Sequence, residues 1–244
     1  MTSPSPAHMA SNFLLSRLSE DDRARLVNHM RILEMKPGEV LQQAGDEVVD
    51  TWFPCGPSMA CFCVSAQDGD GFVEVALIGR EGAIGGIVSN GQVPSYATAR
   101  VLYGGQFLRV KISTLEQAKL DSIALRHWFS RYSDCLLAQV FQTAACNARH
   151  TVTQRTAKWL LAAMSRTGKA DLTVTQRQLA EMLGVGRSFI ARTVSRFREE
   201  GILGTRRGVF IITDEARLRA TSCKCTAAIE DHFDTVLHGI YPAK

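Results

Sequence analysis

The sequence predicts an α+β protein, and three stretches of its 244 residues carry that prediction. Residues 31–113 hold a series of short β-prone runs separated by glycine-containing turns, which is typical of a β-barrel, sandwich or roll. Residues 125–164 contain no proline and have helical spacing. Residues 172–212 combine two short helices with a hairpin. The chain is long enough for two domains with separate cores.

The first residues predict little regular structure. Residues 1–12 are polar, contain proline and lack an apolar signal core, so we expect a loose tail. Residues 12–30 alternate leucines with charges, and Ser19 with Asp22 forms a capping signal, so a short helical entry is expected there.

The β-rich part follows directly. Its turns are expected at Pro37, Gly45, Asp68 and Gly79, and the runs between them are ILEM, EVLQQ, DTWF, ACFCV, FVEVALI, AIGGIV, YATARVL and FLRVKI. Helical character returns at Ser113, which forms a capping box with Glu116.

The long helical segment carries a stripe of alternating four and three spacing, the pattern of a coiled-coil seam. Packing inside one subunit fits the same spacing equally well. The predicted dimer seam consists of Phe129, Tyr132, Leu136, Gln139 and Thr143.

Residues 172–212 have the order of a helix-turn-helix followed by a winged hairpin. Thr175 and Gln178 form a capping box that starts a short helix, and Gly184 ends it. A second helix is expected over residues 187–200, in which Ile190, Val194 and Phe197 face inward.

The other face of this second helix offers short hydroxyls and guanidinium groups, which suit close approach to the major groove of DNA. Arg206 and Arg207 lie in the hairpin turn, where they can meet phosphates. A helical hairpin whose basic face is simply solvated is the alternative. We expect DNA contacts from Arg187, Ser188, Arg192, Ser195, Arg196, Thr175, Arg206 and Arg207.

These residues resemble the signature of the Crp/Fnr family of bacterial transcription regulators, LA-x-x-L-G-V-x-R-x-x-[VI]. The family positions that contact bases correspond to Arg187, Ser188 and Arg192. The middle position is commonly Glu, so the preferred operator does not carry over. The matching residues are Leu179, Ala180, Leu183, Gly184, Val185, Arg187 and Ile190.

The resemblance covers residues 12–220, and the whole chain is expected to form four units. Three of these are a cyclic-nucleotide-binding-like β-roll (a double-stranded β-helix) over 12–120, a long dimerisation helix over 121–150 and a winged helix-turn-helix over 151–220; the fourth, a helical tail over 221–244, is expected from helical spacing alone. The resemblance further implies a homodimer on a palindromic operator in double-stranded DNA, with RNA polymerase as an additional partner.

Family members that bind cyclic AMP use a Glu for the ribose and an Arg for the cyclic phosphate. At the corresponding places this chain has Gly82, Ala83, Ile84 and Gly85, then Ser95 and Tyr96. Loss of a charge-assisted contact costs about 2–3 kcal/mol. We therefore expect a degenerate pocket that does not bind cyclic AMP, and the sequence selects no other effector or cofactor.

The composition is that of an ordinary globular protein with a net charge of +4. It contains no apolar run of the ~20 residues that a membrane helix needs. The seven cysteines are odd in number and accompany no export signal, which predicts free thiols in the cytoplasm.

Two other functions stay open. A redox- or metal-responsive regulator could use Cys55, Cys61 and Cys63, or Cys223 and Cys225. Buried packing explains these thiols more simply, and a solvated role explains His150, so no metal site is expected. A β-roll enzyme would need a nucleophile with a base or a carboxylate pair, and we find neither, so no catalytic residues are assigned.

Overall fold

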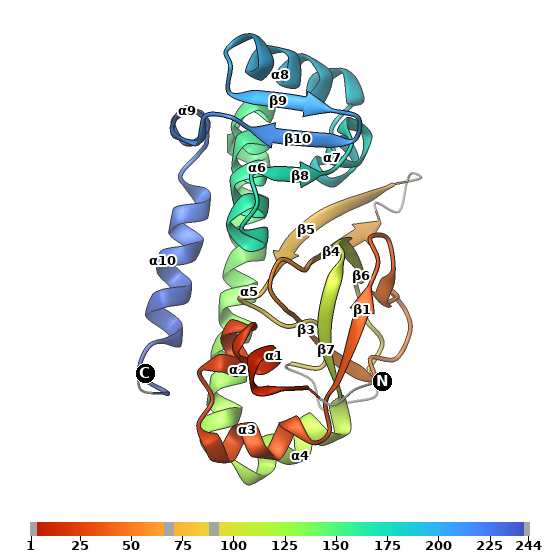
Figure 1. Ribbon diagram of the computed structural model, residues 1–244, viewed down its shortest axis with the longest axis vertical. Helices are drawn as coiled ribbons and strands as arrows, with labels where there is room; N and C mark the ends of the chain where they lie inside the picture. The colour runs from red at the N-terminus through yellow and green to blue at the C-terminus, as the bar shows by residue number, and fades with distance from the viewer. Residues whose placement is uncertain (1–3, 66–70, 88–92, 242–244) are drawn as a thin grey trace.

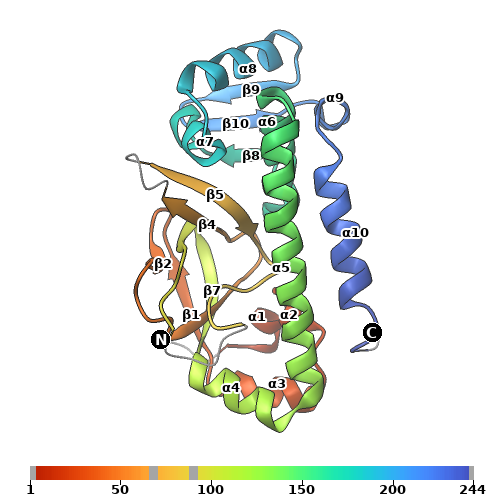
Figure 2. The same cartoon turned by 180° about the vertical axis from the view of Figure 1, so that it is seen from behind.

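The computed structural model describes residues 4–65, 71–87 and 93–241. Helix α5 (Ile123–Arg149) runs along most of the molecule. A β-roll lies on one flank, a smaller mixed unit caps one end, and helix α10 (Cys225–Leu237) lies along the other flank (Figures 1 and 2). The predicted α+β class is confirmed. Among the helices described, none is both long and apolar enough to cross a bilayer.

The N-terminal residues are more ordered than their composition predicts. Helices α1 (Pro6–Ala10), α2 (Phe13–Ser16) and α3 (Glu20–Val27) precede the first strand. Pro6 occupies the first position of α1, where its missing amide costs nothing, and Met9 is buried. The expected loose tail is therefore wrong from Pro6 onward. Ser19 caps α3 through the Asp22 amide, as predicted.

Asn12 holds this entry against the roll. Its side-chain oxygen accepts from the amides of Leu14 and Leu15, and its Nδ2 donates to the carbonyls of Pro54 and Gly82, each at 2.9 Å. A fully buried amide group thus has its hydrogen-bonding capacity used.

The roll consists of two antiparallel sheets. One has the order β1-β7-β3, from Arg31–Met35, Gly105–Lys111 and Asp50–Pro54. The other has the order β2-β6-β4-β5, from Val40–Gln42, Thr98–Tyr103, Met59–Ser65 and Phe72–Ile78. Seven of the predicted β-prone runs thus contribute strands, and the predicted turn at Asp68 lies outside the described residues.

The eighth run, AIGGIV, forms no strand over its described residues. Only Ile84 makes an isolated bridge, to Trp52. Gly85 and Gly86 have φ values of 83° and 60°, a left-handed backbone that interrupts extended pairing.

Helix α4 (Ile112–Asp121) joins the roll to α5. Its N-cap is Lys111, which makes no side-chain capping bond, so the predicted capping box of Ser113 and Glu116 is wrong. Glu116 pairs instead with Lys119. The long helical segment divides at His150, and α6 (Val152–Thr167) begins with its own capping box from Thr151 and Gln154.

The predicted dimer seam faces the interior of its own subunit. Phe129, Tyr132 and Gln139 are buried, while Leu136 and Thr143 are half-buried. The Tyr132 hydroxyl accepts from the Ala83 amide at 2.9 Å and donates to the Ala83 carbonyl at 3.0 Å, and Gln139 Nε2 donates to the Leu77 carbonyl at 3.0 Å. The seam prediction is wrong for Phe129, Tyr132 and Gln139, because α5 uses these residues to pack on the roll; Leu136 and Thr143 stay predictions.

The capping unit contains helices α7 (Gln176–Leu183) and α8 (Arg187–Glu199) and a small sheet. The sheet has the order β8-β10-β9, from Asp171–Thr173, Val209–Ile212 and Leu203–Arg206. Strand β8 is absent from the sequence prediction. Helix α9 (Glu215–Thr221) then leads to α10, which runs back along α5, and Tyr241 packs edge-on against Trp128 with ring centroids 5.4 Å apart.

Candidate nucleic-acid interface

The turn between α7 and α8 is built from the residues that the sequence singled out. The Thr175 hydroxyl accepts from the Gln178 amide at 3.1 Å, and Gln178 Oε1 accepts from the Thr175 amide at 2.9 Å. Gly184 has a φ of 60°, a left-handed conformation in which a side chain would be strained. These two features fix where α7 begins and ends, and so where α8 starts.

Helix α8 is oriented by its apolar side. Ile190, Val194 and Phe197 are at most 1% exposed, so the inward triad is confirmed. The opposite side is solvent-exposed at the outer end of the molecule (Figure 1), and the structure brings together there five of the predicted DNA-binding residues: Arg187, Ser188, Arg192, Ser195 and Arg196. Thr175 is also exposed.

The arginines of α8 differ in their partners. Arg196 Nε lies 2.7 Å from Glu200 Oε1, one helical turn later. The Arg192 guanidinium instead lies 4.8 Å from the ring centroid of Phe189, which is 49% exposed. Sequence reasoning missed Phe189. A large apolar side chain beside the inward triad was the available signal.

The wing carries two arginines beside an acidic strand. Arg207 and Gly208 form the tip between β9 and β10, and Gly208 has a φ of 72°. Arg206 Nη2 lies 3.0 Å from Asp171 of β8. Both arginines are exposed, so both remain available as predicted phosphate contacts, although Arg206 must share its charge with Asp171.

The predicted effector pocket is only partly assembled. A cavity of about 210 Å³ inside the roll is lined by Ala83, Gly85 and Ser95. Gly82 and Ile84 do not line it, because Gly82 faces the Tyr132 hydroxyl and Ile84 bridges to Trp52 in the core. Tyr96 is 84% exposed and points to solvent. These three assignments are wrong.

The character of this cavity matters for any ligand. Its other described lining residues are Gln42, Val48, Phe62, Gly86, Ile87, Val93, Pro94, Ile112 and Leu136, so no charged side chain is among the described residues that line it. Burial of an anion there would lack a compensating cation.

The roll touches the helix-turn-helix unit directly. Glu74 of β5 accepts a hydrogen bond from Trp159 Nε1 of α6 at 2.7 Å, and Glu81 pairs with Arg166 of α6 at 2.7 Å. Burial raises the pKa of Glu74 to about 7, against the smaller lowering effect of the Trp159 bond.

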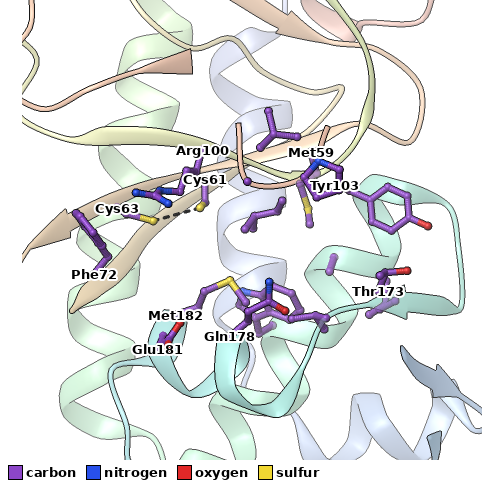
Figure 3. Close-up of a pocket in the computed structure, with 18 residues that line it drawn as sticks. Met59, Cys61, Cys63, Phe72, Arg100, Tyr103, Thr173, Gln178, Glu181 and Met182 are labelled. Carbon is purple, nitrogen blue, oxygen red and sulfur yellow. Dashed lines mark hydrogen bonds between the residues drawn. The ribbon is translucent and has the colours of Figure 1, made fainter. Parts of the chain in front are cut away.

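A second cavity of about 270 Å³ lies between β4, β5, β6 and α7 (Figure 3). Arg100, Gln178 and Glu181 line it, together with Cys61 and Cys63, whose sulfur atoms are 3.2 Å apart. All seven cysteines of the chain are free and buried, which agrees with the expectation of free thiols.

Comparison with known families decides the nature of the C-terminal unit. Residues 154–221 match the family described as a Crp-like helix-turn-helix domain. The chain carries a Crp-like helix-turn-helix domain. This match includes α7, the Gly184 turn, α8 and the wing.

Solved structures extend the likeness to the whole fold. FixK2 from Bradyrhizobium japonicum superposes with a TM-score of 0.66 at 16% identity, over 80% of this chain and 98% of that one. The c-di-GMP-responsive regulator CLP from Xanthomonas campestris has a TM-score of 0.63 at 16% identity, over 80% and 100%. A CRP-family transcriptional regulator from Thermus thermophilus has a TM-score of 0.65 at 15% identity, over 78% and 96%. At these identities the likeness concerns the fold.

No curated protein sequence matches the chain significantly. The Crp/Fnr resemblance drawn from the sequence is nevertheless confirmed, by the domain match in residues 154–221 and by the fold of the rest. The chain thus carries a Crp-like helix-turn-helix domain, on a fold like that of solved Crp/Fnr-type regulators.

Proposed function

We propose that this chain is a transcription regulator of the Crp/Fnr type, that it acts as a homodimer on a roughly palindromic operator, and that the exposed face of α8 reads bases in the major groove. The observation that carries the proposal is the orientation of α8, whose apolar triad is fully buried while its arginines and serines face solvent. Arg187, Ser188 and Arg192 read base edges, and Arg206, Arg207 and Thr175 hold the backbone phosphates.

Dimerisation uses a different stripe of α5 from the one that the sequence predicts. This second stripe, which we name the outer stripe, has the same alternation of four and three residues. All its members are exposed: Ser130, Asp134, Leu137, Phe141, Ala144 and Ala148.

The centre of the outer stripe is apolar. Leu137 is 49% exposed and Phe141 is 64% exposed, so neither α10 nor the described part of the roll covers them. Burial of two copies of each on a two-fold axis would stabilise a pair of chains at about 25 cal/mol per Å² of apolar surface. Such a pair presents two α8 helices to successive major grooves about 34 Å apart.

Control of this dimer is assigned to the roll and not to cyclic AMP. The described lining of the inner cavity supplies no cation for a cyclic phosphate. In this division, residues 12–120 respond to a signal, 121–150 pair the chains, 151–220 bind DNA and 221–244 brace α5. The complex works in the cytoplasm, beside RNA polymerase at promoters, and we assign it no catalytic role.

The test begins with selection of bound sequences from a random pool of duplex DNA. The proposal expects a symmetric site with two half-sites one helical turn apart. Arg192→Ala should then weaken binding to that site by about 10- to 100-fold and relax discrimination at one base pair per half-site.

Arg219→Ala is the matched control. Arg219 lies in α9 of the same unit and pairs with Glu215. This change therefore also removes one arginine charge, but at a position outside the α8 face. It should leave affinity nearly unchanged. Equal losses for the two variants, or no affinity of the wild type for any duplex at low salt, would refute the proposal.

A further inference from the structure

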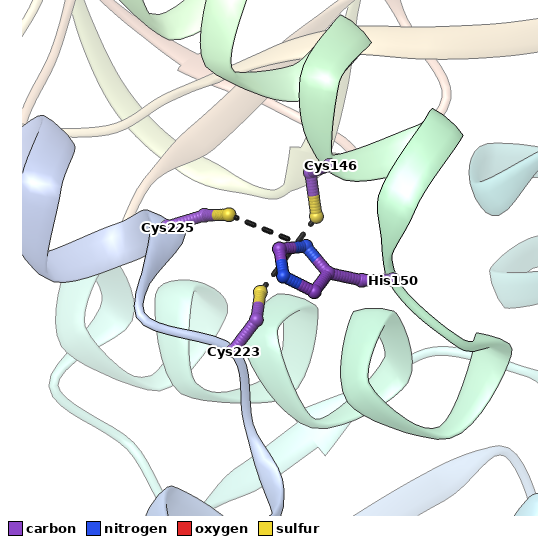
Figure 4. A group of neighbouring side chains, drawn as sticks. All are labelled: Cys146, His150, Cys223 and Cys225. Carbon is purple, nitrogen blue, oxygen red and sulfur yellow. Dashed lines mark hydrogen bonds between the residues drawn. The ribbon is translucent and has the colours of Figure 1, made fainter.

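Four potential metal ligands meet where the long helix ends. Cys146 lies on the last turn of α5 and His150 is its C-cap, while Cys223 lies in the connection from α9 to α10 and Cys225 is the first residue of α10 (Figure 4). The three sulfur atoms and a ring nitrogen of His150 all lie within 4.8 Å of one another. The side chains converge from two parts of the chain that are more than 70 residues apart.

The separations match one tetrahedral ion. The sulfurs of Cys146 and Cys223 are 3.7 Å apart, and Cys225 Sγ lies 3.6 Å from His150 Nδ1. Zinc bonds of about 2.3 Å to sulfur and about 2.0–2.1 Å to nitrogen give tetrahedral edges of roughly 3.8 Å between two sulfurs and roughly 3.5 Å between sulfur and nitrogen. A disulfide would need a sulfur separation of about 2.05 Å. An iron–sulfur cluster would spread its ligands farther, because several metal ions and sulfides lie between them.

The local backbone supports the site. His150 is the C-cap of α5, and its amide donates to the Cys146 carbonyl at 3.0 Å, which keeps the two residues next to each other; Cys223 and Cys225 are separated only by Lys224, the N-cap of α10. The three thiols are at most 8% exposed, while His150 is partly exposed. Gln142 Nε2 lies 3.2 Å from Cys225 Sγ and donates to it, which is the outer support that metal-binding thiolates commonly have.

The charge of the surroundings fits the same ligand set. A divalent ion held by three thiolates and one neutral imidazole carries a net charge of −1. Lys158 and Arg155 of α6 lie close enough to Cys146 to interact with it electrostatically, and both are cationic. They would balance the complex in a partly buried place.

We propose that Cys146, His150, Cys223 and Cys225 bind one Zn²⁺ per chain. Four protein ligands leave no open position, so the role is structural: the ion fastens the α9–α10 connection to the junction of α5 and α6. That junction sets how the helix-turn-helix unit is carried by α5. The site is separate from the α8 face and does not depend on DNA binding.

The chain contains a matched control. Cys61 and Cys63 also have neighbouring sulfurs, 3.2 Å apart, but no third and fourth ligand joins them among the described residues. Two thiols alone do not close a tetrahedral site. The Cys61 and Cys63 pair tests whether two neighbouring cysteines in this protein are enough to bind the metal.

The experiment uses the full chain without a histidine tag, purified anaerobically with reductant. Elemental analysis should find one zinc per chain. After metal removal, titration with Co²⁺ should give one equivalent bound, with the thiolate charge-transfer and intense visible bands of a tetrahedral Cys₃His site.

Variants then locate the ligands. Cys223→Ser with Cys225→Ser should abolish the cobalt bands, Cys61→Ser with Cys63→Ser should keep them, and His150→Cys should keep one equivalent while shifting the bands toward a Cys₄ site. Circular dichroism of each variant checks folding. If the double serine variant does not fold, His150→Ala replaces it as the variant that lacks a ligand.

Several results would overturn the proposal. They are metal-free wild-type protein that binds no Co²⁺, a mapped disulfide between Cys146 and Cys223 in the reduced preparation, loss of binding in the Cys61 and Cys63 variant, or iron in place of zinc. None of these measurements involves DNA, so failure here and failure of the regulator proposal are distinguishable.

Discussion

At the scale of single residues, Arg192 stands apart from the other arginines of α8. Arg196 is held by Glu200, whereas Arg192 lies over the Phe189 ring and no acid neutralises it among the described residues. A cation over an aromatic face keeps its full charge and its hydrogen-bond donors. The Phe189 ring therefore orients the Arg192 guanidinium and leaves its hydrogen-bond donors free, which suits a group that must contact a base.

The wing arginines should act on affinity without sequence preference. We expect Arg207→Ala to weaken specific and random duplexes alike and to reduce the salt slope of binding by about 1. Arg206→Ala should have a smaller effect, because Asp171 already shares its charge. Fluorescence anisotropy over a series of salt concentrations measures both slopes.

Asp171→Asn is the companion change. It releases Arg206 and should tighten binding to random duplex, whereas a wing that lies away from DNA would leave all three variants unchanged.

Glu74 should give the protein a pH-dependent stability. Its folded pKa is raised to about 7, above its ordinary 4.5, so the folded state holds the proton more tightly than the unfolded state does. The contribution of Glu74 to the free energy of unfolding is therefore fully present below about pH 4.5 and is lost as the pH rises through 7. Glu74→Gln keeps an acceptor for Trp159 but cannot ionise. The free energy of unfolding of this variant, measured in urea, should exceed that of the wild type by about 1–3 kcal/mol at pH 8 and equal it near pH 4.

Glu81→Gln is the control for that comparison. Glu81 forms an ion pair with Arg166 in the same interface, so its neutralisation should not stabilise the protein at pH 8. Parallel stability curves for Glu74→Gln and the wild type would mean that the Glu74 carboxyl titrates normally.

Features encoded within a few residues could be predicted from the sequence. Thr175 with Gln178, and Gly184 with its left-handed backbone, determine their local geometry without help from distant parts of the chain. The pocket assignments at Gly82, Ile84 and Tyr96 failed because they depended on which way each side chain turns inside the roll, and spacing does not determine that.

At the scale of elements, α5 shows why periodicity has limits. Two of its stripes share the alternation of four and three, one through Phe129 and Tyr132 and one through Leu137 and Phe141. Hydrophobicity favoured the first, and the roll buries it within the subunit. Only the position of the neighbouring sheet separates the stripe that packs inside from the one left for a partner.

A charge in the outer stripe should separate the subunits. We expect Phe141→Glu to convert the dimer into monomers at micromolar concentration, because two carboxylates would meet across a two-fold apolar contact. Sedimentation velocity measures the mass of the species directly.

Phe189→Glu places the same charge on another exposed phenylalanine, in α8 and away from the stripe. It should remain dimeric. A dimeric Phe141→Glu protein would place the subunit contact elsewhere on the chain.

Two elements departed from their composition for local reasons. Helix α1 forms in a polar, proline-containing segment because Pro6 is tolerated at its first position and Met9 reaches the core. The AIGGIV run is apolar yet forms no strand over residues 83–87, because Gly85 and Gly86 take left-handed backbones.

At the scale of the whole molecule, the roll and the helix-turn-helix unit share a core. Met59, Cys61 and Leu77 of the roll belong to the same apolar cluster as Trp159 and Met182. Together with the Glu74 and Glu81 contacts, this cluster gives a change in the roll a direct physical route to α7 and α8. The cluster of metal ligands could not be predicted from the sequence, because Cys146 and Cys223 become neighbours only after α10 folds back on α5.

That return of α10 also has a practical side. It brings Tyr241 to within 2.7 Å of Asp22, so the described chain finishes beside the helices with which it starts, at the end of the molecule opposite α8 (Figure 1). A fluorophore attached at the start of α1 or near Tyr241 would therefore lie away from α8 and leave the exposed face of that helix uncovered.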